Sequence, residues 1–182
     1  MSILLIAASP SARSRSGALL AAASERLQHL GLTSQTLRLR ELPPAALLHA
    51  DFEHGGIQQA VQTVAQAQVI VLATPIYKAA YSGLLKVFLD LLPQDGLKGK
   101  TIWPLATGGS LAHLLALDYA LQPVLSSLGA RSPLDPVFAT DAQLPRADDG
   151  SYQVGDEIAR RLSVGAAAVF ERLPRTEPAL AQ

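Results

Sequence analysis

The stretch VIVLATPIYKAAYSGLLKVFLD, residues 69–90, decides the fold. Its first five residues are all apolar, which is typical of a strand that a parallel sheet buries on both faces. A helix is expected over Gly83–Leu92, and it is apolar almost all round except for Lys86 and Asp90, which are spaced for an i,i+4 ion pair. A strand, a loop and a helix in this order make one unit of an α/β fold.

The same alternation continues on both sides of this stretch. We expect further strands at residues 3–8, 33–40, 101–106 and 137–140, and further helices at about 19–30, 57–67, 110–128 and 157–173. This order predicts a single doubly wound domain over residues 1–173, with a five-stranded parallel sheet covered by helices on both faces. Residues 174–182 are expected to be a flexible C-terminal tail.

The composition excludes several classes of protein. The chain has 182 residues, of which 49% are hydrophobic and 16% are charged, and this apolar surplus predicts a subunit interface. With 15 basic and 15 acidic residues the net charge is zero, which argues against a nucleic-acid or membrane partner. The absence of Cys excludes disulfides and cysteine nucleophiles. Because no apolar run is long enough for a membrane span or a signal peptide, we expect a cytoplasmic protein.

Ligands of such a sheet bind outside the carboxyl ends of the strands, so the loops there are the candidate site. The loop after the first strand, SPSARSRS over residues 9–16, supplies four hydroxyls, two guanidinium groups and the start of a helix, which together suit a phosphate dianion. The alternative is a Ser-rich loop whose only role is to cap the helix at Ser14 or Ser16. The chain contains no G-x-G, so neither a Rossmann nor a Walker phosphate loop is indicated.

Two more loops follow the next two buried strands. One carries Tyr77, Lys78 and Tyr81, which could pack on and hydrogen-bond a flat heterocycle, although both tyrosines could equally belong to the core. The other carries Gly108 and Gly109, which allow backbone amides to approach a ligand, or which merely form a tight turn. A phosphate loop next to two ring-approaching loops is what a mononucleotide such as FMN requires.

At these residues the chain resembles the NADPH-dependent FMN reductase family, which has a flavodoxin-like fold. The motifs that carry the resemblance are T-P-x-Y at residues 74–77, G-x-L-K at residues 83–86 and the following Asp90. Within the family the chain is most similar to the flavin reductase component of two-component alkanesulfonate monooxygenase systems, through the stretches ATPIYKAAYSG, LATGGSLAHLLALDYAL and QPVLSSL. The resemblance runs from Ile3 to about Asp141, and nothing is carried over beyond it. It implies the sheet order 2-1-3-4-5.

The resemblance also implies the site residues. The phosphate of FMN is expected at Ser9, Ser14, Arg15 and Ser16, with Arg13 as a further basic residue that lies two positions later than its counterpart in the most similar relative. The flavin ring is expected against Pro75, Ile76, Tyr77, Thr107, Gly108, Gly109 and Ser110. No catalytic side chain is implied, because hydride passes from NADPH or NADH directly to the flavin. The relatives carry a π-helical insertion near a tetramer interface, at the position that corresponds to Tyr119, which is therefore a candidate modulator of the flavin.

A proline supports the π-helix independently. Pro123 falls inside the expected long helix, has no N–H to donate to the carbonyl of Tyr119, and clashes with that carbonyl. A widened turn over Leu117–Leu121 would absorb both effects, whereas a plain proline kink is the alternative.

These inferences predict an NAD(P)H-dependent FMN reductase, a homotetramer or homodimer, that supplies reduced FMN to a partner monooxygenase in alkanesulfonate desulfonation and sulfur acquisition. One alternative is a quinone or azo reductase that retains its FMN, and another is a flavodoxin-type electron carrier, which the neutral charge disfavours. A hydrolase is excluded because the last His, His113, comes only three residues after Ser110, so the order of a Ser–acid–His triad cannot be met. The four His residues are scattered, and no metal site is predicted.

Overall fold

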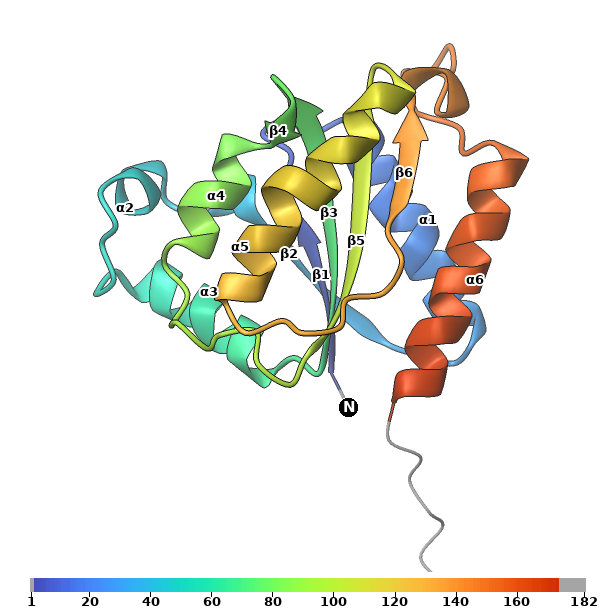
Figure 1. Cartoon of the computed structure of the whole chain (residues 1–182). Coiled ribbons are helices and arrows are strands. Elements are labelled where there is room, and N and C mark those ends of the chain that lie inside the picture. Colours follow the sequence, from blue (N-terminus) through green and yellow to red (C-terminus); the bar gives the residue numbers. More distant parts are fainter. Residues whose placement is uncertain (1, 174–182) are drawn as a thin grey trace, which may run out of the picture.

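A computed structural model describes residues 2–173 of the chain. Five parallel strands form its centre in the order β2-β1-β3-β5-β6 (Figure 1). The strands are β1 (Ile3–Ala7), β2 (Ser34–Arg38), β3 (Val69–Tyr77), β5 (Thr101–Gly108) and β6 (Val137–Thr140). Numbered among the parallel strands alone, this is the predicted order 2-1-3-4-5, so the doubly wound flavodoxin-like topology is confirmed.

A sixth, very short strand was not predicted. It is β4 (Ala80–Tyr81), which pairs antiparallel with the last two residues of β3. The turn between them places Lys78 at φ 50° and Ala79 at φ 61°, which lies in the left-handed backbone region that residues other than glycine rarely adopt. Without a Gly or Asn at either position, the sequence carries no ordinary hairpin signal.

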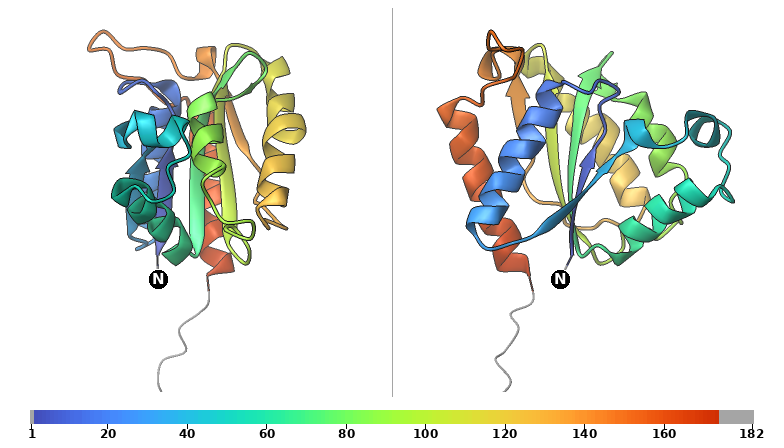
Figure 2. Two further views of the ribbon diagram at one scale, coloured as in Figure 1. Left: turned by 90° about the vertical axis from the view of Figure 1, so that its left-hand side faces the viewer. Right: turned by 180° about the vertical axis from the view of Figure 1, so that it is seen from behind.

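Helices cover both faces of the sheet, as Figure 2 shows from two further directions. On one face, α1 (Arg15–His29) and α6 (Asp156–Arg172) pack on a core that includes Leu5, Val71 and Trp103. The other face is covered by α3 (Gly55–Gln66), α4 (Gly83–Leu89) and α5 (Gln122–Ser127). Successive strand residues point to opposite faces, and so β1, β3, β5 and β6 each contribute to both cores.

Two predicted boundaries were wrong in the same direction. β3 continues through the T-P-x-Y motif to Tyr77, and Pro75 stands opposite Thr107 of β5 in the sheet, so this motif is a strand end and not a loop. β5 likewise continues through Gly108. The extended backbone that proline favours for itself and the preceding residue is compatible with a strand. The connection after residue 42 also contains an unpredicted short helix, α2 (Pro44–Leu48).

The helix expected over residues 110–128 is divided into three segments. A 3-10 turn (Leu111–Leu114) is followed by a π-helix (Leu117–Leu121) and then by α5. The amide of Gln122 donates to the carbonyl oxygen of Leu117, five residues earlier, which is the π-helical pattern. Pro123 then occupies the first turn of α5, where its missing N–H is tolerated. The predicted π-helix is therefore confirmed, whereas the continuous helix was wrong.

Two other local predictions, an ion pair and a helix cap, are confirmed. The ion pair between Lys86 and Asp90 is present, with Nζ 2.6 Å from Oδ1. Ser14 is the N-cap of α1, and its Oγ accepts a hydrogen bond from the amide of Gly17 at 3.0 Å. No helix within residues 2–173 is long and apolar enough to span a membrane. The predicted tail, residues 174–182, lies outside the described part of the chain.

Candidate functional site

The candidate site is a cavity of about 240 Å³ at the carboxyl ends of β1, β3 and β5. It lies where the strand order reverses, between β1 and β3, which is where open α/β sheets bind ligands. Ten of the twelve residues proposed to bind the cofactor line it, and the exceptions are Ser9 and Ser110. Its lining residues are Ser11, Arg13, Ser14, Arg15, Ser16, Pro75, Ile76, Tyr77, Thr107, Gly108, Gly109, Asp141 and Tyr152.

The loop after β1 ends at the N-terminus of α1. Ser14 caps the helix, and its hydroxyl oxygen lies 3.4 Å from that of Ser16. Ser9 is buried below the loop, where its Oγ accepts a hydrogen bond from the amide of Ser11 at 3.2 Å. Ser9 therefore stabilises the conformation of the loop through this hydrogen bond. The hydroxyl of Ser14 and the first amides of α1 are the groups that could bind an anion.

The two arginines of this loop have different surroundings. Arg15 donates from Nε to the carbonyl oxygen of Leu144 at 3.2 Å, and its Nη1 lies 3.4 Å from the Asp141 carboxylate. Its guanidinium carbon also lies 4.9 Å from the centre of the Tyr152 ring, which makes a cation–π contact. Arg13, in contrast, is exposed beside the turn that carries Asp149.

The charge of Arg13 has a small effect on Asp149. The pKa of the Asp149 carboxyl is lowered mainly by hydrogen bonds from Ser151, and the nearby Arg13 guanidinium lowers it further. The backbone amide of Ser151 donates to the Asp149 carboxylate at 2.9 Å. Asp149 is thus an ionised surface group close to the loop after β1 at neutral pH.

Two buried hydroxyls hold the second loop against the first. Thr74 Oγ1 accepts a hydrogen bond from the amide of Ser82 at 3.0 Å, and Ser82 Oγ donates to the carbonyl oxygen of Ala8 at 2.6 Å. Ser82 also caps α4, since its Oγ accepts from the amide of Leu85. The side chain and amide of Ser82 therefore link the end of β1 to β3. Sequence reasoning missed Ser82, and its position just before the helix that begins at Gly83 was the available signal.

The ring side of the cavity has a buried floor and an open edge. Pro75 and Ile76 are buried, whereas Tyr77 is 50% exposed. In the third loop, a Cβ at Gly108 would lie 3.0 Å from Nδ1 of His113, but a Cβ at Gly109 would meet no heavy atom within 4 Å. Gly109 therefore borders open space, and it also lines the cavity.

His113 has a structural role in this arrangement. Its Nδ1 is buried, and it makes no hydrogen bond with any of residues 2–173. It packs on Gly108, and it is not among the residues that line the cavity. Ser110 is exposed and lies outside the cavity. Within the described range, no three His, Asp or Glu side chains lie close enough together to hold a metal ion.

Asp141 and Tyr152 are site residues that sequence reasoning did not identify. Both come from the segment after β6, which lies at the end of the stretch that carries the family resemblance and beyond it. Neither belongs to a recognisable motif. Their membership in the site depends on how this segment folds back over the start of α1, which local sequence does not indicate.

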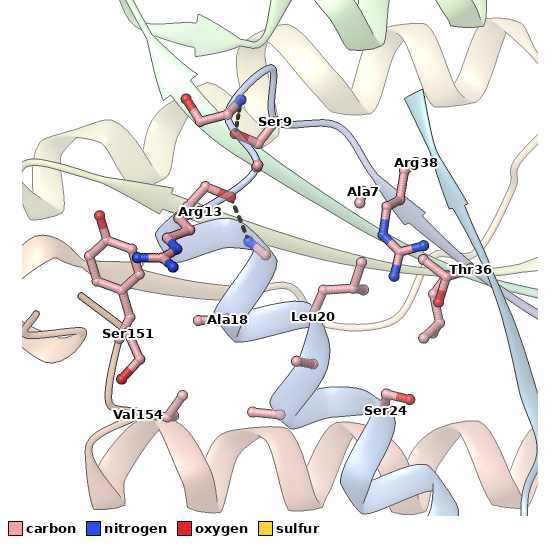
Figure 3. A pocket seen from close by; sticks show the side chains of 18 of the residues that line it. Ala7, Ser9, Arg13, Ala18, Leu20, Ser24, Thr36, Arg38, Ser151 and Val154 are labelled. Atoms are coloured by element: carbon pink, nitrogen blue, oxygen red, sulfur yellow. Dashed lines mark hydrogen bonds between the residues drawn. The ribbon is translucent and has the colours of Figure 1, made fainter. Parts of the chain in front are cut away.

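A larger surface depression, of about 1040 Å³, adjoins the cavity and runs along α1 (Figure 3). It shares Ser11, Arg13, Ser14 and Tyr152 with the cavity. Figure 3 shows Arg13 extending toward the segment that carries Ser151, whereas Arg38 lies on the opposite side of the helix. We place the ligand in the smaller cavity, because only there do the loops after β1, β3 and β5 meet.

A sheet of this order, with a helix N-terminus and two strand ends meeting at its reversal point, defines the flavodoxin-like class of mononucleotide-binding proteins. Residues 1–144 match the model of the family described as NADPH-dependent FMN reductase. The chain therefore belongs to the NADPH-dependent FMN reductase family, and it is an oxidoreductase that uses FMN with NAD(P)H as the hydride donor.

Individual relatives agree with this assignment. FMN reductase (NADPH) of Pseudomonas putida KT2440 is 48% identical over 148 residues, which is 81% of this chain and 75% of that protein. FMN reductase (NADPH) of Escherichia coli K12 is 47% identical over 144 residues, which is 79% of this chain and 75% of that protein. Among solved structures, the apo form of the NADH:FMN oxidoreductase EmoB is 38% identical, has a TM-score of 0.84 and covers 97% of this chain and 91% of that one.

Proposed function

We propose that this protein reduces FMN as a diffusible substrate and supplies the reduced flavin to a partner monooxygenase of alkanesulfonate desulfonation. The observation that carries the flavin assignment is the meeting of the three strand-end loops in one cavity. The partner assignment is supported by the resemblance to flavin reductase components of two-component alkanesulfonate monooxygenases.

The phosphate end of the site fits an FMN phosphate. The first amides of α1 carry the positive end of the helix dipole, and the hydroxyls of Ser14 and Ser16 stand beside them. Arg13 is exposed at the mouth of the cavity and can move toward a phosphate, whereas Arg15 is already engaged by Asp141 and Leu144. We assign direct charge neutralisation mainly to Arg13.

The ring end fits a flat heterocycle held on one side. Pro75 and Ile76 form an apolar floor, and the open space at Gly109 admits the edge of a ring close to backbone. The cavity, about 240 Å³, is slightly smaller than ligand pockets of about 300–1,000 Å³, so we infer that it encloses a flavin only in part and that a nicotinamide reaches the ring from the open side. When bound, FMN accepts the hydride and stores the electrons.

The protein contributes alignment and not acid–base chemistry. The cavity lining holds one carboxylate, that of Asp141, and this group is paired with Arg15, so it is not free to act as a base. Holding the two rings face to face converts a bimolecular transfer into an intramolecular one. The ends of β1 and β3, joined through the Thr74–Ser82 and Ser82–Ala8 hydrogen bonds, supply part of that rigidity.

We further propose that the active form is a homotetramer or homodimer. Three large apolar side chains are exposed within one short stretch next to the site: Leu111 at 69%, Leu115 at 55% and Tyr119 at 79%. Monomeric proteins rarely expose such a group, and a self-complementary interface would cover it. Sedimentation velocity of the wild type should give a single species of two or four chains, and a monomer at micromolar concentration would refute the proposal.

Steady-state oxidation of NADPH by purified protein, with and without added FMN, tests the flavin reaction. We expect oxidation that requires added FMN and saturates with it, and we expect the protein to purify without bound flavin. Protein that retains yellow flavin and reduces quinones or azo dyes without added FMN would support the alternative reductase. Parallel assays with NADH establish the nicotinamide preference.

The partner assignment needs a coupled assay. The protein is mixed with an FMNH2-dependent alkanesulfonate monooxygenase, an alkanesulfonate, NADPH and FMN, and the release of sulfite is measured. Sulfite release that depends on both proteins is expected. Rapid NADPH oxidation without sulfite release would leave the flavin reductase activity intact but contradict the proposed partner.

A further inference from the structure

We propose that Tyr152 is a positioning residue for the phosphate group of the flavin, and that it acts through Arg15. This inference rests on the proposed flavin site. It assigns a role to the segment after β6, residues 141–155, of which residues 145–155, including Tyr152, lie beyond the residues that match the family model.

Tyr152 is mounted on a hydrogen-bonded turn. Arg146 and Tyr152 form an antiparallel bridge, and the amide of Ala147 donates to the carbonyl oxygen of Ser151 at 2.9 Å. The turn between them contains Gly150 at φ 81°, a conformation that favours glycine. The amide of Gln153 donates to the carbonyl oxygen of Pro145 at 3.0 Å, which fixes the far side of the turn. The ring of Tyr152 is therefore attached to a defined loop and not to a free surface chain.

Three contacts hold the guanidinium of Arg15 against this segment. They are the hydrogen bond to Leu144 at 3.2 Å, the ion pair with Asp141 at 3.4 Å and the stacking on Tyr152 at 4.9 Å. Arg15 is the first residue of α1, directly after the N-cap Ser14. Fixing its side chain therefore fixes the helix start, whose amides and hydroxyls face the cavity.

The chemistry of the ring suits an anion site. The face of an aromatic ring attracts a guanidinium without placing a full negative charge beside the ligand. A second carboxylate in place of Tyr152 would hold Arg15 as firmly, but it would repel the phosphate dianion. Asp141 already neutralises part of the charge of Arg15, so an aromatic partner preserves the remaining positive charge for the phosphate.

The contact geometry predicts an effect that depends on the phosphate. Tyr152 stacks on Arg15, the first residue of α1, and this contact involves none of Pro75, Ile76 and Gly109, which we assign to the flavin ring. Riboflavin has the same ring as FMN but no phosphate. Loss of the aromatic face should therefore weaken the binding of FMN more than that of riboflavin, whereas a general structural defect would weaken both equally.

The experiment measures the dissociation constants of FMN and riboflavin by quenching of flavin fluorescence, for the wild type, Tyr152→Leu and Tyr152→Phe. Tyr152→Leu should raise the dissociation constant of FMN by about two- to fivefold and thereby lower the FMN-to-riboflavin preference by the same factor. Tyr152→Phe keeps the aromatic face and should retain the wild-type preference. In steady state, the KM for FMN should rise while kcat at saturating FMN stays constant.

A double-mutant cycle tests whether the effect passes through Arg15. Arg15→Lys keeps the charge but loses the planar group that stacks, and the double variant Arg15→Lys/Tyr152→Leu should bind FMN no more weakly than Arg15→Lys alone. Additive losses, an equal loss of FMN and riboflavin, or an unchanged FMN preference in Tyr152→Leu would each overturn the inference. If the wild type binds neither flavin, the proposed function itself fails, which is a separate result. Thermal unfolding of each variant checks folding, and Tyr152→Ile, which also lacks the aromatic face, replaces Tyr152→Leu in the cycle if that variant does not fold.

Discussion

A substitution at Gly109 should weaken flavin binding while leaving the stability of the folded protein almost unchanged. A Cβ there would have no heavy atom within 4 Å, and the φ angle of Gly109 is not in the left-handed region. The folded protein should therefore accept Gly109→Val with a change of less than about 0.5 kcal/mol in the free energy of unfolding. The added methyl groups would instead project into the space that we assign to the flavin ring.

The expected effect on binding follows from overpacking. Forcing an added side chain into an occupied, well-packed space costs about 1–3 kcal/mol, which corresponds to a roughly 5- to 150-fold weaker affinity for FMN. Fluorescence titration with FMN gives the affinity, and thermal unfolding without flavin gives the stability. If Gly109→Val binds and reduces FMN as well as the wild type, the ring does not lie against this loop.

Gly108 provides the matched control, because the neighbouring glycine should behave in the opposite way. A Cβ at Gly108 would lie 3.0 Å from Nδ1 and 3.1 Å from Cβ of His113, and 3.2 Å from Cζ of Phe138. Gly108→Ala should therefore lower the free energy of unfolding by about 1–3 kcal/mol even without flavin. A stable Gly108→Ala variant would show that this packing is looser than the structure indicates.

Three further predictions concern stability and are checked by thermal or urea unfolding. Gly165→Ala should lower the free energy of unfolding by about 1–3 kcal/mol, because the new Cβ would overlap the buried ring of Trp103. Helix propensity alone predicts that the same change raises this free energy by about 1 kcal/mol, so a more stable variant would refute the packing argument. Lys100→Met removes two hydrogen bonds, each 2.7 Å, from Nζ to carbonyl oxygens at the C-terminal end of α3. The free energy of unfolding should fall by roughly 1 kcal/mol, because the partial burial that lowers the pKa of Lys100 also costs desolvation energy and offsets part of the gain from these bonds; an unchanged free energy of unfolding would mean that water replaces both bonds in full. Asp90→Asn breaks the exposed ion pair with Lys86 and should change stability by less than about 0.5 kcal/mol, and a larger change would indicate that this surface is buried in an assembly.

Features that depend on neighbours in the chain could be predicted from the sequence. The apolar run of β3 specifies a buried strand, Ser14 specifies the start of α1, and Pro123 specifies the widened turn over Leu117–Leu121. In each case the cause lies within a few residues of its effect: side-chain hydrophobicity, a capping hydroxyl or a missing amide proton. The alternation of strands and helices then left few topologies open, because parallel crossovers are right-handed.

The candidate site was predictable only in part, for the same reason. Ten of the twelve proposed cofactor residues lie in one cavity because they occupy strand ends or the loop and helix start that follow a strand, and parallel strands bring their carboxyl ends to one edge. Ser82 was missed because its role depends on the carbonyl of Ala8, 74 positions earlier in the chain. The residues next to Arg15 in the sequence also do not indicate whether its guanidinium is exposed or is held by Asp141 and Leu144.

By itself, then, the amino-acid sequence determined the α/β class, the family and the three loops after β1, β3 and β5 that line the site, but not the segment after β6 that supplies Asp141 and Tyr152. Only the tertiary structure decided which of the two arginines is held and which is exposed, since the partners of Arg15 lie as far as 137 positions away, at Tyr152. It also decided that Gly108 is packed whereas Gly109 is open, although the two are adjacent glycines with no local difference. The physical reason is that hydrogen bonds, ion pairs and close packing act through space over a few ångströms, and local sequence does not specify which distant residues come within that range.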